Sequence, residues 1–175
     1  LGIIGMVSII VVAIASIMHL ITGKEKWDSL AYATAELGVI FATLILVTGA
    51  IWARPVWGVW WTWDAKLTTT LVLWFIYVGY LMIRAHGPSG TQGKRYASVI
   101  ALIGAIDSPI IYKATDWWRT AHPERNVPSD LAPEMLLTLL VAMVTFTVLY
   151  VYLLVERYSL RKSESDLDEL HQRTA

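Results

Sequence analysis

Five long apolar stretches alternate with short polar segments along this 175-residue chain. They cover residues 1–21, 36–53, 67–83, 96–112 and 131–155. Each comes close to the roughly 20 residues that a helix needs to cross the hydrocarbon core of a bilayer. Because only a helix satisfies its own backbone polar groups in hydrocarbon, the pattern predicts an all-α, polytopic membrane bundle with five spanning helices.

The alternative is a water-soluble helical bundle, whose helices would each carry a polar stripe. Residues 9–15 and 71–76 are apolar on every side, which disfavours that alternative. The composition agrees, since 16% of the residues are charged and 56% are hydrophobic. A soluble domain usually has about 25% charged residues.

The polar segments between the predicted spans fall alternately on two sides of the membrane. One side holds residues 22–35, 84–95 and the polar tail 157–175, with nine Lys and Arg residues; the other holds 54–66 and 113–130, with five. Basic residues are enriched on the cytoplasmic side, so the first side is predicted to be cytoplasmic. The chain is therefore expected to form a transmembrane bundle, 1–156, with two outer loops and a cytoplasmic tail.

Tryptophan is concentrated in the first outer loop, which contains or adjoins five of the nine in the chain. The loop contains Trp57-Gly58-Val59-Trp60-Trp61-Thr62-Trp63-Asp64. If this segment is helical, Trp57, Trp60, Trp61 and Asp64 share one face. Indoles on one face form a flat apolar shelf on which a planar macrocycle would stack. Tryptophan also anchors helix ends at the membrane interface without any ligand, which is the role expected for Trp27, Trp52 and Trp74.

The second outer loop adds two indoles and a histidine, in the order Trp117-Trp118-Arg119-Thr120-Ala121-His122. A neutral imidazole is a good ligand for haem iron, although a histidine in an exposed loop is more often simply solvated. Basic side chains accompany both loops: Arg54, Lys66, Lys113, Arg119 and Arg125. They would pair with carboxylates such as haem propionates, or with lipid phosphates.

Other chemistry is excluded or weakly indicated. The chain has no cysteine, which excludes thiolate metal sites and covalent haem attachment to this chain. It has no Gly-rich phosphate loop, and its formal net charge of +0 gives no support for nucleic-acid binding. His19 is predicted to be a packed or interfacial histidine. Asp107, two residues before Pro109, is an intramembrane carboxylate with either a functional role or a structural role at a helix kink.

The segment 57–68 resembles the WWD signature of the cytochrome c assembly family, in particular the haem exporter protein C (CcmC) type. The likeness extends to residues 46–55, 107–112 and 117–122, and it spans residues 36 to about 154. Such proteins are integral to the plasma (inner) membrane of prokaryotes or to the organelle equivalent. The resemblance also implies six spanning helices. The first of these, and the outer loop that precedes the helix at the start of this chain, match no residue here, so we expect that they are missing.

The resemblance further implies that haem b is held non-covalently and transiently on the outer face, with His122 as one of two axial iron ligands. It implies that the haem passes to a membrane-tethered haem chaperone (CcmE-like) and that ABC transporter subunits complete its release. The residues expected to contact haem are His122, Trp57, Trp60, Trp61, Trp63, Asp64, Trp117, Trp118, Arg54, Lys66 and Arg119.

The predicted function is haem binding and transfer in cytochrome complex assembly, without bond-making chemistry on this chain. Two alternatives stay open at this point. One is an enzyme of the cytochrome c haem lyase type, although such relatives resemble larger proteins. The other is a structural membrane subunit in which the tryptophans serve only as anchors.

Overall fold

The computed structural model describes residues 2–88, 90–118 and 132–174. These residues form five α-helices and no strand: α1 (Gly2–Thr22), α2 (Glu25–Trp57), α3 (Ala65–His86), α4 (Thr91–Trp117) and α5 (Pro133–Thr174). All five are long and apolar enough to cross a membrane. The all-α, five-span prediction is therefore confirmed.

The helix α2 is longer than predicted, because it begins at Glu25 and not near residue 36. Its first turns carry Glu25, Lys26 and Asp28, which resemble a loop in the sequence. At 1.5 Å per residue, a helix of 33 residues is about 50 Å long and extends beyond a hydrocarbon core of roughly 30 Å. The charged turns of α2 can therefore lie outside the hydrocarbon while the helix remains continuous.

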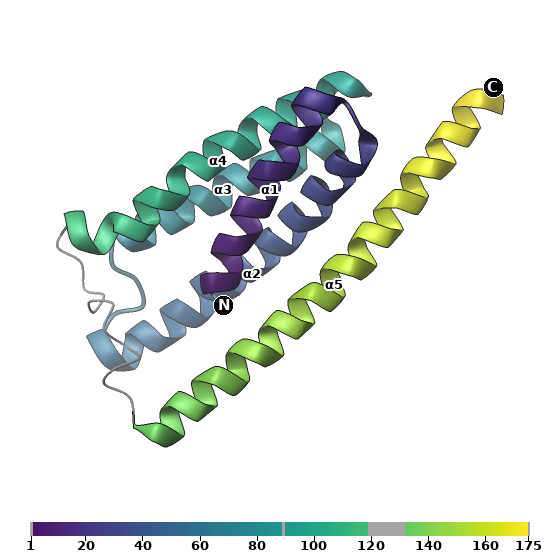
Figure 1. Cartoon of the computed structure of the whole chain (residues 1–175). Coiled ribbons are helices and arrows are strands. Elements are labelled where there is room, and N and C mark those ends of the chain that lie inside the picture. The colour runs from purple at the N-terminus through teal and green to yellow at the C-terminus, as the bar shows by residue number, and fades with distance from the viewer. Residues whose placement is uncertain (1, 89, 119–131, 175) are drawn as a thin grey trace.

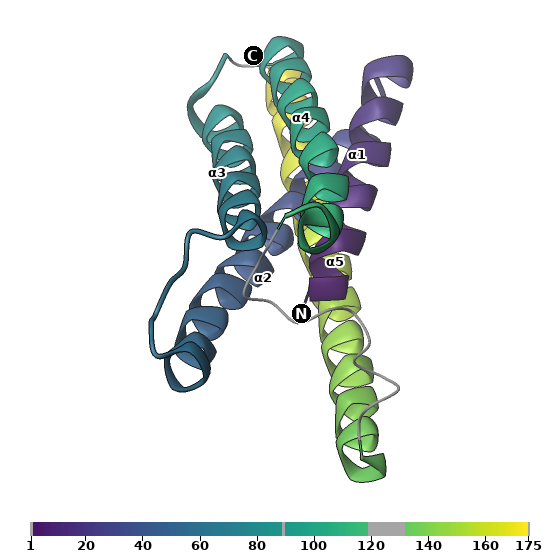
Figure 2. The same cartoon turned by 90° about the vertical axis from the view of Figure 1, so that its left-hand side faces the viewer.

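The helices α1 to α4 pack together as a bundle, and α5 lies along the α2 side of it (Figure 1). The segment between α2 and α3 and the end of α4 lie at the same end of the bundle, as both views show (Figures 1 and 2). We call this end the loop end. At the other end, which we call the opposite end, Gly23 and Lys24 join α1 to α2, and α3 is followed by α4.

Small residues let the helix backbones approach closely within the bundle. A Cβ atom on Gly104 of α4 would lie only 2.7 Å from Cε2 of Tyr77 on α3. A Cβ atom on Gly38 of α2 would lie 3.7 Å from Cβ of Ser8 on α1. Because hydrocarbon supplies no hydrophobic drive between helices, such close van der Waals packing is a main source of their association.

Ion pairs from α2 to three other helices hold the opposite end together. Asp28 accepts a hydrogen bond from Arg84 of α3 at 2.7 Å, and the two side chains are only 6% and 5% exposed. Glu25 pairs with Lys94 of α4, and Glu36 pairs with Arg157 of α5. In every one of these pairs α2 supplies the carboxylate, so this helix links α3, α4 and α5 electrostatically.

The predicted packing of His19 is confirmed at this same end. The side chain is 3% exposed, and its Nδ1 lies 3.4 Å from the carbonyl oxygen of Lys24. Glu36, by contrast, does not begin a helix as its position in the sequence suggested. It lies eleven residues inside α2, because the charged residues before it are helical too.

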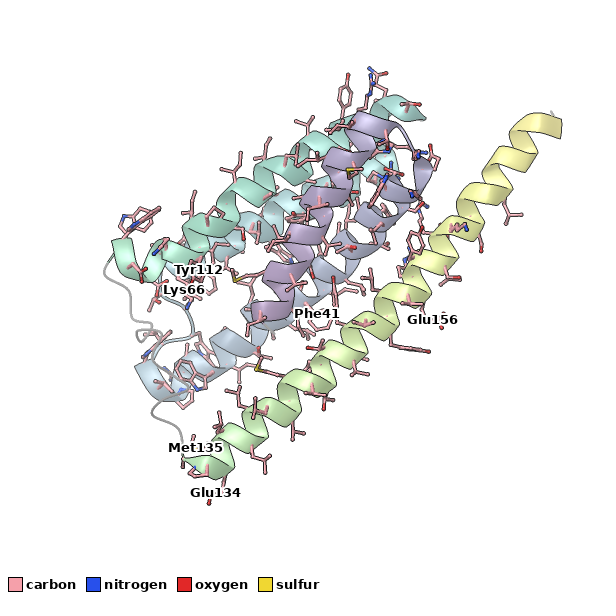
Figure 3. The ribbon with its side chains drawn as sticks, in the orientation of Figure 1. Phe41, Lys66, Tyr112, Glu134, Met135 and Glu156 are labelled. Atoms are coloured by element: carbon pink, nitrogen blue, oxygen red, sulfur yellow. The ribbon has the colours of Figure 1, made fainter. Side chains whose placement is uncertain are left out.

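The helix α5 is attached to the bundle through its middle and its opposite-end half. Tyr150 is buried, packs edge-to-face on Phe41 with ring centroids 5.6 Å apart, and lies 2.8 Å from the hydroxyl of Ser8. Nearer the loop end, most side chains from Pro133 to Leu149 are exposed on the protein (Figure 3). The helix also continues through the segment predicted as a polar tail, because residues 157–174 contain neither Pro nor Gly and are rich in helix formers.

Candidate functional site

The first outer loop begins where α2 ends, and Gly58 makes that end possible. Gly58 has φ 76° and ψ −3°, a left-handed conformation that glycine adopts without a Cβ clash. Its N–H donates to the carbonyl of Arg54 at 3.0 Å, and the Arg54 guanidinium donates back to the Gly58 carbonyl. These contacts within one turn end the helix, and the backbone conformation of Gly58 sets the direction in which the chain continues.

The residues from Gly58 to Asp64 are not helical, so the predicted helical face of Trp57, Trp60, Trp61 and Asp64 is wrong. The left-handed Gly58 stops α2, and the next helix begins only at Ala65. The indoles gather instead through edge-to-face contacts. The ring centroids of Trp52 and Trp57 lie 5.3 Å apart, and those of Trp61 and Trp63 lie 5.7 Å apart.

The indoles of this loop remain largely accessible. Trp60 is 58% exposed and Trp63 is 77% exposed. The Arg54 guanidinium carbon lies 6.0 Å from the Trp60 ring centroid, within the range of a cation–π contact. The Nε1 of Trp61 is shielded from solvent but has no hydrogen-bond partner among the described residues. The loop therefore offers exposed aromatic surface together with one unused donor.

Asp64 ends the loop as the N-cap of α3. Its Oδ1 accepts a hydrogen bond from the N–H of Leu67 at 2.8 Å, and its Oδ2 lies 3.5 Å from Oγ1 of Thr62. An N-cap carboxylate satisfies an otherwise unpaired N–H group and suits the positive end of the helix dipole. The sequence interpretation gave Asp64 a place on the indole shelf and missed this structural role, although Asp followed by a helical stretch is a usual cap signal.

The second outer loop begins after α4, at the same end of the bundle (Figure 1). Trp117 and Trp118 are 61% and 50% exposed, and their ring centroids lie 5.9 Å apart. Lys113 pairs with Asp116 at 3.2 Å one turn earlier. Arg119, His122 and Arg125 lie outside the described residues, so the predicted iron ligand has no position here.

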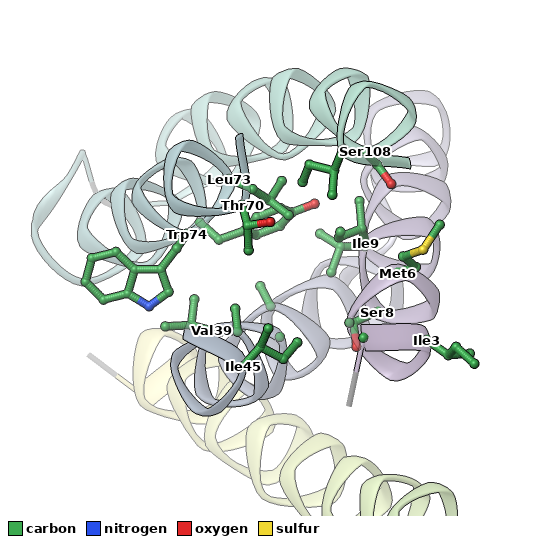
Figure 4. Close-up of a pocket in the computed structure, with 18 of the residues that line it drawn as sticks. Ile3, Met6, Ser8, Ile9, Val39, Ile45, Thr70, Leu73, Trp74 and Ser108 are labelled. Carbon is green, nitrogen blue, oxygen red and sulfur yellow. The ribbon is translucent and has the colours of Figure 1, made fainter. Parts of the chain in front are cut away.

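A cavity of about 490 Å³ lies between α1, α2, α3 and α4, in the half of the bundle nearest the loop end (Figure 4). Its volume falls in the range of small-molecule sites, about 300–1,000 Å³. Aliphatic side chains form most of its wall, among them Ile9, Val12, Val39, Ile45 and Leu73. Polar side chains are fewer: Ser8, Thr34, Thr70, Tyr77 and Ser108, with Lys66 and Tyr112 toward the loop end (Figure 3).

The sequence interpretation did not predict this cavity. A signal for it exists in α2, where Ala35, Gly38 and Ala42 line the cavity at spacings that place them on one helix face. Small residues on a face that points into a bundle leave space when the opposing side chains do not fill it. Asp107 lies close by in sequence, is half-buried, and its Oδ2 has no hydrogen-bond partner among the described residues.

The site predicted from sequence is thus partly assembled. Most of its residues lie at the loop end, around the exit of α2, the start of α3 and the end of α4: Arg54, Trp57, Trp60, Trp61, Trp63, Asp64, Lys66, Trp117 and Trp118. Two of its members, Arg119 and His122, lie in the undescribed segment. The arrangement offers exposed indoles at one end of the bundle and an apolar cavity within that half of it.

Comparison with known proteins places this arrangement in a family. The family model described as "Heme exporter protein C" matches residues 1–172. Heme exporter protein C of Bradyrhizobium diazoefficiens is 39% identical, over 82% of this chain and 56% of the relative. That of Haemophilus influenzae is 33% identical, over 88% of this chain and 64% of the relative. A ccmC-like mitochondrial protein of Marchantia polymorpha, described in terms of cytochrome c biosynthesis, is 36% identical over 67% of this chain and 49% of its own length. The chain therefore spans about half to two thirds of the length of these relatives.

Proposed function

The chain belongs to the heme exporter protein C family, and from this premise we propose that it binds haem at the loop end and passes it on during cytochrome c maturation. It is an integral membrane protein with a role in haem handling. The names of the relatives describe transport rather than catalysis, and we assign no bond-making chemistry to this chain. The observation that carries the finer proposal is the exposed aromatic surface at one end of the bundle.

Five indoles at that end are at least half exposed: Trp52, Trp60, Trp63, Trp117 and Trp118. Large apolar surfaces left exposed together indicate a binding site, whether for a ligand, a partner or a membrane. A haem macrocycle is flat and apolar, so it would bury such rings by stacking. The indoles meet edge-on, Trp61 with Trp63 in the non-helical segment and Trp117 with Trp118 at the end of α4, which gives a ligand several ring faces and edges to contact.

Basic side chains at the loop end suit the carboxylates of haem. Lys66 is half-buried near the cavity and is the second residue of α3. Its ammonium group belongs to the lining of the cavity at the loop end, where it can pair with a carboxylate of a bound ligand. Arg54 is held against Gly58 and Trp60, which positions its guanidinium beside the exposed ring. We propose that Lys66 and Arg54 pair with the propionates, together with Arg119.

We further propose that His122 is an axial ligand of the haem iron and that haem b is held non-covalently and transiently. The chain contains no cysteine for a thioether bond, so any retained haem must be held by ligation, stacking and ion pairs. The basic excess on the opposite side supports our proposal that the loop end faces the outer side of the membrane. The recipient would be a membrane-tethered haem chaperone, with ABC transporter subunits completing release.

The visible spectrum of the purified protein tests this proposal. We expect a haem spectrum in the wild-type protein and a shifted or lost spectrum in His122→Ala. His86→Ala is the matched control, because His86 is an exposed histidine at the opposite end of α3. A spectrum that His122→Ala leaves unchanged would remove His122 as the iron ligand. Absence of haem from both proteins, with haem supplied in excess, would overturn the proposal.

A second candidate function is that of a membrane subunit whose tryptophans serve only as interfacial anchors. The exposure of Trp60 and Trp63 at a helix end also suits that role. Replacing both residues with tyrosine distinguishes the two functions, because tyrosine also favours the interface but offers a smaller ring. Unchanged cytochrome c assembly would favour anchoring, whereas lost assembly at normal protein abundance would favour the haem site.

A further inference from the structure

The walls of the cavity are closed in two different ways. Between α3 and α4, the backbone at Gly104 lies directly against Tyr77. Between α1 and α2, Gly38 lies against Ser8, and a Cβ on Gly5 would lie 3.6 Å from Cδ1 of Ile45. On these walls the backbone of one helix lies directly against a side chain of the next, so the helices leave little space between them there.

The wall between α2 and α3 is instead bridged by one side chain. Trp74 of α3 lines the cavity, and its Nε1 donates to Oγ1 of Thr43 on α2 at 2.8 Å. Trp74 is half-buried and Thr43 is exposed, so the bridge lies between the cavity and the outside of the bundle. Figure 4 shows Trp74 at the edge of the cavity, on the side where α3 faces α2. A change of side-chain rotamer would open this wall without any movement of a helix.

The depth of the bridge places it in the hydrocarbon region, so Trp74 is not the interfacial anchor at a helix end that the sequence suggested. Trp74 is the tenth residue of α3, which puts it about 14 Å along the helix from its loop end. An indole N–H in hydrocarbon is costly without an acceptor. Thr43 is a suitable acceptor because its own proton is used in a bond to the carbonyl of Val39 at 2.8 Å. The closed position of Trp74 is therefore favoured but rests on a single hydrogen bond between the two helices.

We infer that the crevice between α2 and α3 is a side entrance from the lipid to the cavity, and that the Trp74–Thr43 contact closes it. This inference rests on the proposed function and names the route by which haem arrives. Haem dissolved in the membrane keeps its carboxylates at the interface and its macrocycle in the hydrocarbon. Entry between α2 and α3 keeps the carboxylates at the interface, near Lys66. It keeps the macrocycle in the hydrocarbon, at the depth of Trp74.

Entry from the opposite end would lack this match. The carboxylates would have to pass a core of closely packed side chains that includes Ala31, Tyr80, Ala97 and Ala101. They would also have to pass the buried pair of Asp28 and Arg84. Moving a charged group through such a core is expensive, so the side route is the less costly of the two.

Removal of the acceptor provides the first test. In Thr43→Val the shape is kept and the acceptor is lost. We expect the initial rate of haem transfer from haem-loaded vesicles to the protein in acceptor vesicles to rise roughly threefold to tenfold, the factor that one lost hydrogen bond gives. Thr48→Val is the matched control, because Thr48 is also exposed on α2 and bonds only to the Leu44 carbonyl among the described residues. Equal rates in Thr43→Val and Thr48→Val would contradict the entrance.

A reversible cross-link provides the second test, since the chain has no other cysteine. In Thr43→Cys/Trp74→Cys, a short reducible bifunctional thiol reagent would join α2 to α3 across the crevice. We expect lipid-borne haem uptake to fall on the order of tenfold when the bridge is formed and to recover on reduction. Haem uptake by the single variant Trp74→Cys should not slow in this way after treatment with the same reagent.

The outcomes separate the entrance from the function. If the wild-type protein takes up haem and the cross-linked pair takes it up at the rate of the reduced pair, the entrance is wrong and haem binding stands. If the wild-type protein takes up no haem, either from lipid or from water, the proposed function falls and the entrance falls with it. If the cross-linked pair takes up haem from lipid more slowly but reaches the same final haem occupancy, both the entrance and the proposed function are supported.

Discussion

The two ends of the bundle are held together by different kinds of contact. At the opposite end, Asp28, Glu25 and Glu36 of α2 pair with α3, α4 and α5, so contacts run between helices. At the loop end, the contacts described above run within single segments. Arg54 bonds to Gly58, Asp64 to Leu67, and Lys113 to Asp116. The loop end also carries the exposed indoles and lies nearest the cavity.

This difference suggests a division of roles along the membrane normal. Interhelical ion pairs at one end fix how the helices are arranged. The contacts described at the other end cap α2 and α3 locally, and the exposed indoles and the nearby cavity belong to that end. Changes at the opposite end should therefore lower the stability of the fold, whereas changes at the loop end should lower ligand binding.

The largest effect is expected from Arg84→Ala. It leaves Asp28 buried without its partner, and breaking a buried pair in this way costs about 3–5 kcal/mol. Thermal unfolding in detergent, followed by circular dichroism, should show a large fall in the midpoint. The double variant Asp28→Leu/Arg84→Leu should recover much of the loss, because it removes the stranded charge.

The loop-end counterpart is Lys113→Ala. Lys113 and Asp116 are both more than 40% exposed, so their pair is worth little in stability. We expect a midpoint close to that of the wild-type protein. If Lys113→Ala destabilises the fold as much as Arg84→Ala, the division between a structural end and a binding end is wrong.

A smaller effect is expected midway between the ends, at Gly104→Ala. The added methyl group would meet Cε2 of the buried Tyr77 at 2.7 Å, so the Tyr77 ring or the two helices would have to shift. Overpacking of this kind costs about 1–3 kcal/mol. Gly79→Ala, also in a spanning helix but with nothing within 4 Å of the new Cβ, should be neutral or slightly stabilising in the same unfolding measurement. Equal effects would mean that the contact between α3 and α4 is not tight.

Much of the fold could be predicted from the sequence, because long apolar runs in a membrane protein have only one regular structure available. The failures occur at charged residues. Glu25 and Asp28 indicated a loop, but they extend α2 because Lys94 and Arg84, distant in sequence, neutralise them. Partners that far apart along the chain cannot be found from local pattern. The charged residues at the helix ends were visible in the sequence. Which acidic residue pairs with which basic residue was not.

The residues of the candidate site could be proposed from the sequence, but their arrangement in space could not. The density of tryptophan identified the loop, since it exceeds what anchoring requires. The helical face predicted for Trp57, Trp60, Trp61 and Asp64 was wrong because Gly58 ends α2. A glycine after a helical run is a usual stop signal, and here it overrides the i, i+3, i+4 spacing of the indoles. The cavity was missed because a space is defined by side chains of four helices at once.

Asp64 provides the next prediction, since it can serve the ligand or the helix. Asp64→Ala loses the N-cap of α3 and should cost about 1 kcal/mol of stability. Asp64→Asn keeps a capping oxygen and should restore most of that stability. If Asp64 acts on haem through the position of the loop, haem retention should follow the same order, with Asn close to wild type. Haem loss in both variants alike, measured from the visible spectrum, would show that the charge itself is needed.

A small loss of stability is expected where α5 leaves the bundle, at Tyr150→Phe. The hydroxyl of Ser8 has one proton, which the Ile4 carbonyl accepts at 2.8 Å, so Tyr150 is the donor in the bond to Ser8. Phenylalanine removes that donor but keeps the edge-to-face packing on Phe41, and Ser8 keeps its bond to Ile4.

A net loss of about 0.5–1 kcal/mol is expected for Tyr150→Phe, because one intramolecular hydrogen bond contributes that much. If the opposite end anchors α5, Arg157→Gln, which breaks the pair with Glu36, should lower the unfolding midpoint further than Tyr150→Phe does. The reverse order would mean that α5 is held from its middle, and that ion pairs at the opposite end organise only α2, α3 and α4.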